Sequence, residues 1–420
     1  MNFDESVKYL YGLGNEVLAM KLGLESIGLL LAELGNPHTS YRKIQIAGTN
    51  GKGSTVAFLE SICREAGMRV GATTSPHLIS VTERVRIDGE PISNDAFAML
   101  ATRVRAVSES LVEAGRLENV PTFFEQVTAI ALLAFAEAVV EIAILETGLG
   151  GRFDATTAAG ADTVAITRIA FDHQRILGGT IERIAAEKAA IIGPEKTVVV
   201  ANQPEEAFEV LLDRCLEVGV VPRFSSELNV GFDQNAIVFE SKQVCYRVPH
   251  LGLAGDHQFE NATTAVLLAE SLGIRKDAIE SGLANAVHHG RLERRGRFLL
   301  DGAHNENGAE ALQKYLLESV PRPIVMIFGA MRDKELEGIE SRLFPMAKTV
   351  IVTRAENQRS MDPAELASSA RLFSSDVREA RSVSEALNLA AQAAPNGSTI
   401  VVTGSLYLVG EALAIIDEHS

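Results

Sequence analysis

Residues 43–55 read KIQIAGTNGKGST, a short run with isoleucines at alternate positions that leads into a glycine-rich loop. A helical pattern follows through Ala66, so the loop joins a strand to a helix. Glycines let backbone N–H groups approach phosphate oxygens, the start of a helix is electropositive, and Lys52 adds a cation. The stretch therefore predicts a phosphate-binding loop rather than a tight turn with a surface lysine.

The loop departs at one position from the usual phosphate-binding sequence. Gly53 follows Lys52, where the usual sequence places a Ser or Thr hydroxyl on magnesium. A glycine has no side chain that could ligate a metal, so we expect oxygen or nitrogen ligands from elsewhere in the chain to complete the metal shell. The loop residues predicted to contact ATP are Gly48, Thr49, Asn50, Gly51, Lys52, Gly53, Ser54 and Thr55.

Short strand-like runs alternate with helical segments, a pattern typical of α/β proteins with a mostly parallel sheet. We predict a larger N-terminal P-loop domain over residues 1–290 and a smaller C-terminal Rossmann-like α/β domain over residues 291–420, with a linker near residue 290, at the charged stretch 290–296. Residues 222–250 alternate in a β manner, and we expect them to add antiparallel strands to the first domain. The other runs expected to be strands are 43–47, 69–72, 141–145, 162–167, 197–201, 298–300, 324–328, 349–353 and 399–403.

Charge and cysteine content narrow the classes of function. The chain of 420 residues has a formal net charge of -16, so its overall field repels nucleic acid and anionic lipid. The three cysteines form no CxxC pair, which fits a reducing cytoplasm rather than a disulfide framework or a zinc site. The N-terminal residues do not resemble a signal peptide, and Glu137 and Glu141 interrupt the apolar stretch 128–145. We expect a cytoplasmic monomer with small-molecule substrates and with no nucleic-acid or membrane partner.

Polar residues follow three other predicted strands. Ser75 comes after the run 69–72, Glu146 after 141–145, and His173 shortly after 162–167. Ligands gather at the carboxyl ends of parallel strands, so the three side chains could meet the phosphate loop. A hydroxyl, a carboxylate and an imidazole are plausible partners for a magnesium ion that also holds nucleotide oxygens. Each residue alone could be a cap, a turn residue or a satisfied polar contact, but the three together favour a metal site.

Runs spread along nearly the whole chain carry a specific resemblance. Together they resemble the folylpolyglutamate synthase and dihydrofolate synthase family, a branch of the Mur ligases. The runs are residues 47–55, 74–78, 146–156, 172–173 with 177–178, 187–189, 255–262, 301–305 and 404–410. The resemblance implies an ATP- and magnesium-dependent ligase that joins L-glutamate to dihydropteroate, to folate (poly)glutamates or to both, and the acceptor segments favour an enzyme that does both. Thr157, Ala190 and Glu306 differ from the residues expected of the family, but none of them is a proposed ligand.

The resemblance also implies roles for individual residues. It implies that Ser75, Glu146 and His173 hold magnesium and that Lys188 is carbamylated, since a carbamate offers anionic oxygens to a second ion where an ammonium would repel it. Without the family, Lys188 would be interpreted as a neighbour of Glu187 on a solvated helix face. The residues implied for ATP are Asn261, Arg291 and Asp301. Those implied for the acceptor and the glutamate are Pro121, Thr122, Phe123, Phe124, Phe153, Asp154, Ala155, His304 and Ser405.

The expected chemistry is activation of a carboxylate, whose negative charge makes its carbon a poor electrophile. Attack of the carboxylate on the γ-phosphate gives an acyl phosphate, which the amine of glutamate then displaces. The residues expected to serve catalysis are Lys52, His173 and Lys188. Two other interpretations stay open: a Mur-type ligase for a non-folate acceptor such as a cell-wall precursor, and a regulatory module that binds nucleotide without making amides.

Overall fold

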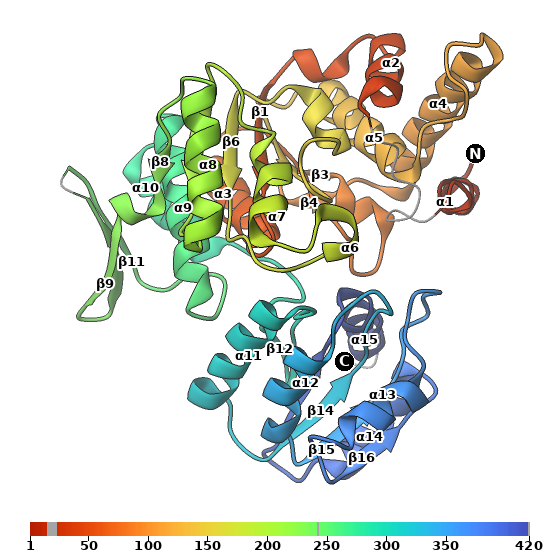
Figure 1. The fold of residues 1–420 in the computed structure, drawn as a ribbon, viewed down its shortest axis with the longest axis vertical. Helices are drawn as coiled ribbons and strands as arrows, with labels where there is room; N and C mark the ends of the chain where they lie inside the picture. The colour runs from red at the N-terminus through yellow and green to blue at the C-terminus, as the bar shows by residue number, and fades with distance from the viewer. Residues whose placement is uncertain (15–22, 242, 419–420) are drawn as a thin grey trace.

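Two α/β bodies make up the protein, and Figure 1 shows the C-terminal body, in blue, below the rest of the chain. The computed structural model describes residues 1–14, 23–241 and 243–418. The first body contains a sheet of eight strands and a separate sheet of three, and the second body contains a sheet of six. The predicted α/β class with mostly parallel sheets is confirmed.

The phosphate loop leaves the first sheet near its centre. The strands of this sheet are β1 (Arg42–Ala47), β2 (Val70–Thr73), β3 (Arg86–Ile87), β4 (Glu90–Pro91), β5 (Ile142–Glu146), β6 (Thr163–Ile166), β7 (Thr197–Val200) and β8 (Arg223–Phe224). Their order is β4-β3-β2-β5-β1-β6-β7-β8, and β1 pairs in parallel with β5 and β6. The carboxyl ends of β2, β5, β1 and β6 therefore meet at one edge of the sheet.

The second sheet begins just after the predicted linker position. Its strands are β12 (Glu293–Arg295), β13 (Phe298–Leu300), β14 (Ile324–Phe328), β15 (Thr349–Val352), β16 (Val377–Glu379) and β17 (Thr399–Thr403). Their order is β12-β13-β17-β14-β15-β16, and β12 is antiparallel to β13. The charged stretch 290–296 is therefore in part an edge strand, where its charged side chains stay in contact with water. We keep the domain division near residue 290 as a proposal.

Helices cover both faces of each large sheet. In the first body these are α1 (Phe3–Gly12), α2 (Glu25–Glu33), α3 (Lys52–Glu65), α4 (Asn94–Glu113), α5 (Phe123–Glu137), α6 (Gln174–Leu177), α7 (Ile181–Ala189), α8 (Glu205–Glu217), α9 (His257–Ser271) and α10 (Lys276–Asn285). In the second body they are α11 (Glu306–Ser319), α12 (Glu337–Leu343), α13 (Pro363–Ala370), α14 (Val383–Ala393) and α15 (Leu406–Glu418). Among the described residues, no helix is long and apolar enough to cross a membrane.

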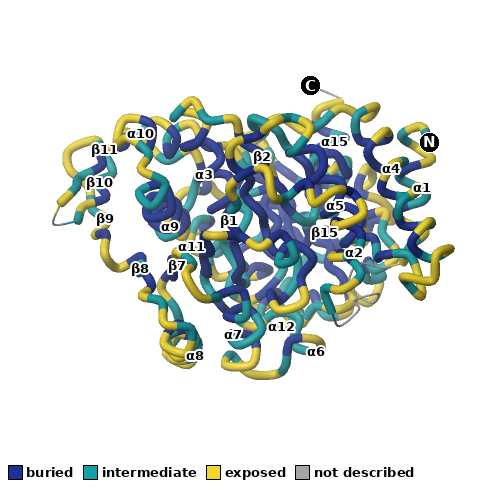
Figure 2. The backbone as a smooth tube through the Cα atoms, turned by 90° about the horizontal axis from the view of Figure 1, so that it is seen from above, coloured by how far each residue is buried: buried dark blue, intermediate teal, exposed yellow. Residues whose placement is uncertain are grey.

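The strands within residues 222–250 mostly lie outside the first large sheet. Their antiparallel pairing is confirmed, but β9 (Asn229–Asp233), β10 (Ala236–Glu240) and β11 (Cys245–Val248) form a sheet of their own. Phe239, Tyr246 and Val248 from this small sheet join the core cluster that includes α3 and α9. Figure 2 shows buried residues along β1 and α9, with exposed residues on the small sheet and on α8.

Substitution of Phe135 tests how the packing of α5 stabilises the first sheet. The ring is fully buried and packs edge-on against Tyr41, with ring centroids 6.2 Å apart. It also covers Gly71 of β2, where an added Cβ would lie 2.5 Å from the ring. We expect Phe135→Ala to lower the free energy of unfolding by about 3–5 kcal/mol, measured by chemical denaturation. Phe232→Ala, at a ring that is 74% exposed, is the control and should cost about 1 kcal/mol or less; equal costs would contradict this packing role.

Candidate active site

The phosphate loop, residues 48–55, connects β1 to α3. Gly51 precedes α3 in the left-handed conformation (φ 91°), and no side chain caps the first turn of the helix. A side chain at this position would collide with the amide of Asn261. Residues 48–54 line the cavity above the loop, whereas Thr55 is buried behind it. The uncapped start of α3 therefore faces the cavity, as an anion-binding helix terminus requires.

Lys52 lies over this loop among other ionisable groups. Its Nζ donates to the carbonyl oxygens of Gly48 and Thr49, both at 3.1 Å. Its positive charge acts on Glu146, His173 and Lys188, which come from three different elements. Lys52 is therefore placed to offset the charge of a bound phosphate.

Glu146 and Ser75 meet because β5 and β2 are parallel neighbours whose carboxyl ends lie side by side. The backbone N–H of Ser75 donates to Oε2 of Glu146 at 3.1 Å. Glu146 is buried, and burial raises the pKa of its carboxyl, while Lys52 is the strongest influence in the opposite direction. A buried carboxylate is stabilised by a cation beside it, so this pair of residues fits a divalent metal.

The carboxylate of Asp172 lies close to three ionisable side chains from the two bodies. Its carboxylate lies 2.5 Å from Nζ of Lys334, 3.8 Å from Nε2 of His304 and 3.9 Å from Nε2 of His173. Burial alone would raise the pKa of Asp172, but Lys334 and then the two histidines outweigh it and hold the pKa well below its usual range. Burial lowers the pKa of His173 to about 4, so its imidazole is neutral and keeps a lone pair for a ligand.

The three predicted metal ligands line one cavity, but they do not form a ready-made cluster. Ser75, Glu146 and His173 all face the space above the phosphate loop. Among the described residues, no group of three or more His, Cys, Asp or Glu side chains is arranged to hold a metal. A hydroxyl or a carbamylated lysine would be needed beside Glu146 and His173. Metal binding by this set therefore stays a prediction.

Lys188 is buried under the phosphate loop and not solvated. Its Nζ donates to the carbonyl oxygen of Gly48 at 2.8 Å. Burial, and then the charge of Lys52, lowers the pKa of Lys188 to about 7. Glu187 instead points outward and pairs with Arg152 at 3.0 Å. The interpretation of Lys188 as part of a solvated helix face is therefore wrong, since α7 turns the two neighbours in different directions.

The predicted ATP residues from outside the loop line the same cavity, which has a volume of about 790 Å³. This volume is in the range usual for small-molecule sites, about 300–1,000 Å³. Asp301 accepts hydrogen bonds from the backbone of Leu292 and Ala303. Burial raises the pKa of its carboxyl, and Arg291 is the strongest opposing influence. Asn261, Arg291 and Asp301 thus line the cavity above the loop, and their contact with ATP stays a prediction.

The two bodies also touch at the phosphate loop itself. Nδ2 of Asn50 donates to Oδ1 of Asn307 at 2.9 Å, and Oδ1 of Asn50 accepts from Nδ2 of Asn305 at 3.0 Å. Both partners lie at the start of α11 in the second body. The loop is therefore in direct contact with the start of α11 in the second body.

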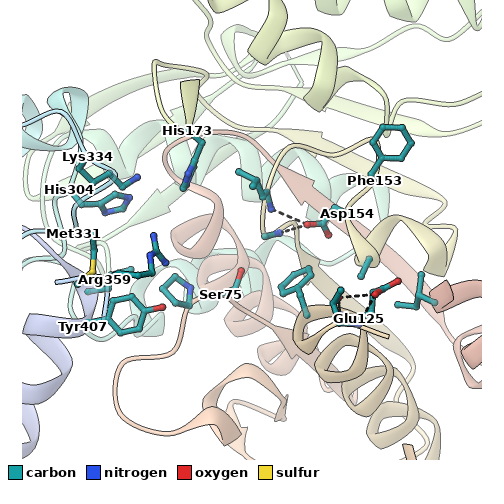
Figure 3. Close-up of a pocket in the computed structure, with 18 of the residues that line it drawn as sticks. Ser75, Glu125, Phe153, Asp154, His173, His304, Met331, Lys334, Arg359 and Tyr407 are labelled. Carbon is teal, nitrogen blue, oxygen red and sulfur yellow. Dashed lines mark hydrogen bonds between the residues drawn. The ribbon is translucent and has the colours of Figure 1, made fainter. Parts of the chain in front are cut away.

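A second cavity begins at Ser75 and extends away from the loop. Figure 3 shows Phe153, Asp154 and Glu125 on one side of Ser75, and His304 and Lys334 on the other. Ser75, Gly148, His173 and His304 line both cavities, so the two spaces adjoin. The other predicted residues in its wall are Thr122, Phe124, Phe153, Asp154, Ala155 and Ser405.

Pro121 and Phe123 do not line either cavity. Phe123 is buried and stacks on Tyr11, with ring centroids 5.5 Å apart, and the guanidinium of Arg84 covers it. Phe124 is the ring that faces the cavity. Successive residues of α5 point about 100° apart around the helix axis, so two adjacent rings cannot share one wall. The structure therefore assigns Phe123 to the core, contrary to the expectation for the acceptor pocket.

Several residues of the site gave no signal in the sequence. Lys334 and Arg359 lie in connections of the second body, and Lys334 reaches Asp172 across 162 positions of the chain. Met331 and Tyr407 also line the second cavity. Only Tyr407 falls within a run that carried the family resemblance, and nothing in its residue type marked it. Tertiary contacts alone bring the others to the site.

Comparison with known proteins identifies the family of the chain. Residues 46–269 match the family model of the Mur ligase middle domain, and residues 290–406 match that of the Mur ligase glutamate ligase domain. The chain belongs to the Mur ligase family. The middle domain of this Mur ligase carries the phosphate loop and Lys188, and its glutamate ligase domain carries His304 and Ser405.

Individual relatives place this Mur ligase in the folylpolyglutamate synthase and dihydrofolate synthase branch. The dihydrofolate synthase/folylpolyglutamate synthase of Bacillus subtilis is 34% identical, over 95% of this chain and 96% of its own length. The Escherichia coli protein of the same name is 32% identical, over 98% and 94%. The chain spans about half the length of a relative from Haloferax volcanii, a probable bifunctional folylpolyglutamate synthase/dihydropteroate synthase that is 36% identical.

Solved structures of similar proteins share the fold over the whole chain. The folylpolyglutamate synthase of Mycobacterium tuberculosis complexed with ADP has a TM-score of 0.90 at 31% identity and covers 99% of both chains. Escherichia coli FolC in complex with DHPP and ADP has a TM-score of 0.89 at 30% identity, covering 100% of this chain and 98% of that one. The two-body architecture is therefore that of these Mur ligases.

Lys334→Met should weaken the contact between the two bodies. Asp172 would stay buried without its nearest cation, and breaking a buried ion pair costs about 3–5 kcal/mol. The low pKa of Asp172 stabilises the folded protein above the ordinary aspartate pKa of about 3.9, and this stabilisation is lost as the pH falls below it. We therefore expect Lys334→Met to lower the free energy of unfolding, measured by chemical denaturation, most strongly near neutral pH and less in acid.

Lys314→Met is the matched control, because Lys314 pairs with Asp256 where both side chains are 54% exposed. Exposed pairs contribute about 1 kcal/mol or less, so this variant should unfold almost as the unchanged protein does. Equal losses in the two variants, or a loss in Lys334→Met that does not depend on pH, would contradict the role given to Asp172.

Proposed function

We propose that this chain is an ATP-dependent ligase that joins L-glutamate to dihydropteroate, to folate (poly)glutamates or to both, through an acyl-phosphate intermediate. Relatives that match nearly the whole chain are named dihydrofolate synthase/folylpolyglutamate synthase. One similar structure holds DHPP and ADP, and another holds Mn, AMPPNP and L-glutamate. These ligands are the three kinds of substrate that the proposed reaction requires.

The observation that carries the proposal is that the two cavities adjoin. One cavity is built around the phosphate loop, and the other has Phe124 and Phe153 in its wall. They share Ser75, His173 and His304. A carboxylate attached to a flat heterocycle can therefore reach the γ-phosphate of a nucleotide without leaving the protein. A site that only sensed nucleotide would not need this connection.

ATP would be held by the phosphate loop and by groups from both bodies. The loop N–H groups and Lys52 would bind the phosphates, and Asn261 would lie near the base. Arg291 and Asp301 would close on the nucleotide from the start of the second body. Because Asn50 contacts the start of α11, a nucleotide bound to the loop would also affect the contact between the loop and the second body.

The hydroxyl, carboxylate and imidazole groups at the site are suitable ligands for a divalent metal, which phosphoryl transfer from ATP requires. Ser75, Glu146 and His173 would hold magnesium, and a carbamate on Lys188 would hold a second ion. The bound metal would offset charge on the phosphate oxygens during transfer. The raised pKa of buried Glu146 supports this assignment, because a nearby cation would favour its ionised form.

The reaction needs activation, capture and protection from water. The carboxylate of the acceptor attacks the γ-phosphorus, ADP leaves, and an acyl phosphate forms. The neutral amine of glutamate then attacks the acyl carbon, phosphate leaves, and the amine nitrogen loses its proton as the amide forms. Because the walls come from both bodies, closure around the intermediate would exclude water that could hydrolyse it.

The acceptor and the amino acid would occupy opposite ends of the second cavity. Phe124 and Phe153 would stack on the pterin ring, with Thr122, Asp154 and Ala155 beside it. His304 and Ser405 would hold glutamate from the second body. His304 lines both cavities and Ser405 lines the second one.

The cellular setting is part of the proposal. Cys63 and Cys215 are buried free thiols, and Cys245 is a partly buried one. Free thiols are usual in a reducing compartment, which supports a cytoplasmic enzyme. The expected monomeric state stays a prediction.

The function is tested by ADP release with glutamate across a panel of acceptors. We expect ADP formation to depend on dihydropteroate, on a reduced folate monoglutamate or on both, with one glutamate added per ADP by mass spectrometry. Lys52→Ala should lower the rate by about 100-fold or more, because the charge of the transferring phosphate loses its fixed cation. ADP release that ignores every pterin acceptor, or unchanged glutamate incorporation in Lys52→Ala, would remove the proposal.

Carbamylation of Lys188 is tested separately with ¹³C-labelled bicarbonate. The neutral amine adds to carbon dioxide and loses a proton, and the pKa of about 7 means that the neutral amine becomes more abundant as the pH rises from 6 to 8. We expect a carbamate carbon signal in the NMR spectrum that grows over this range and is absent in Lys188→Met. Lys196→Met, at a partly buried lysine whose Nζ donates to Ile191, is the control and should keep the signal.

A further inference from the structure

The imidazole of His288 packs directly on the phosphate loop, although none of the roles assigned above includes it. Nδ1 of His288 lies 3.5 Å from Oγ of Ser54. A Cβ added at Gly53 would lie 2.6 Å from Cε1 of His288 and 3.1 Å from its Nε2. The ring therefore fills the space beside position 53, where the usual phosphate loop carries a Ser or Thr side chain. The absence of a side chain at Gly53 leaves the space that the His288 ring occupies.

The hydrogen bonds around Ser54 set the orientation of this ring. Nε2 of Gln258 donates to Oγ of Ser54 at 3.2 Å, so the hydroxyl proton is free to point to Nδ1 of His288. Burial, followed by the charges of Arg291 and Arg86, lowers the pKa of His288 well below its usual range. The ring is therefore neutral, and Nδ1 can accept the Ser54 proton.

The segment that follows His288 is fixed to the second body. The backbone N–H of Gly302 donates to the carbonyl oxygen of Gly290 at 2.9 Å. The backbone N–H of Leu292 donates to Asp301 at 3.0 Å. Arg291 lies between these two anchored residues. His288 thus sits at one end of a short segment whose other end carries Arg291 and contacts Asp301.

We propose that His288 is a positioning residue that fixes the phosphate loop to the segment carrying Arg291, and that position 53 is glycine because the His288 ring occupies the space beside it. This inference rests on the proposed binding of nucleotide at the loop, but it does not depend on which acceptor the enzyme uses. The ring would set the distance between the loop and the Arg291 guanidinium before nucleotide binds, so less ordering would accompany binding.

The test is a double-mutant cycle on nucleotide binding, measured by titration with ADP in the absence of any acceptor. Gly53→Ala alone should raise the dissociation constant for ADP by about tenfold or more, because its methyl group displaces the ring and the loop. In a His288→Ala background, the same change should cost about threefold or less, since the methyl group then has room. Gly231→Ala, where an added Cβ meets nothing within 4 Å, is the control and should leave ADP binding unchanged.

Kinetics separates positioning from a general loss of structure. His288→Ala should raise KM for ATP several-fold and leave KM for the acceptor unchanged, whereas a loosened fold would change both. If His288→Ala melts early, His288→Gln takes its place in the cycle, because its flexible side chain can move away from position 53. Equal penalties for Gly53→Ala in both backgrounds, or no penalty in the otherwise unchanged protein, would overturn the inference. An unchanged protein that binds no ADP would overturn the proposed function as well.

Discussion

The site depends on balancing charges that are buried together around the phosphate loop. Burying one isolated charge is costly, and breaking a buried pair leaves a charge without compensation. Lys52 lies close enough to act on Glu146, His173 and Lys188, while Asp172 is held by Lys334. Glu146, Lys52 and His173 lie at or after the ends of the parallel neighbours β5, β1 and β6, so one sheet edge brings these three together, whereas Lys188 comes from α7 and Lys334 from the second body. Phosphate and metal ions are ligands that such a set of charges would stabilise.

The second body contributes to the same balance of charges. Lys334 neutralises Asp172 from across the interface, and Asp301 stands opposite Arg291. Leu78 of the first body is partly buried and packs against a core cluster of the second body, so apolar packing supports the polar contacts. Substrate binding in the shared cavity would therefore be coupled to how the two bodies meet. The proposed acyl phosphate gives this coupling a chemical purpose, because the intermediate must be kept from water.

The glycine at position 53 shows how one departure from a familiar sequence can alter a whole site. A loop with Ser or Thr at this position places a metal-ligating hydroxyl inside the loop itself. Here the ring of His288 occupies that side of the loop, and Ser75 and Glu146 stand at neighbouring strand ends. The metal ligands would then come from the sheet rather than from the loop. This arrangement links the geometry of the phosphate site to the sheet register and to the segment before Arg291.

Local patterns were enough to predict the central, buried strands but not the short strands β3, β4 and β16. The predicted strands near β1, β2, β5, β6 and β7 have ends within one residue of those observed, because buried parallel strands are short apolar runs bounded by polar turns. The same rule placed Ser75, Glu146 and His173 at one edge. The edge strand β12 was not predicted, because an exposed edge strand with charged side chains does not differ in composition from a loop.

The sequence by itself determined the α/β class, the phosphate loop and the residues at strand ends, because each of these follows from neighbours in the chain. Only the tertiary structure decided that Phe123 belongs to the core and Phe124 to the cavity, that Lys188 is buried, and that Lys334 meets Asp172. Helix rotation and contacts between distant segments settle these points. Such contacts depend on how the two sheets pack, and no local pattern of residues contains that information.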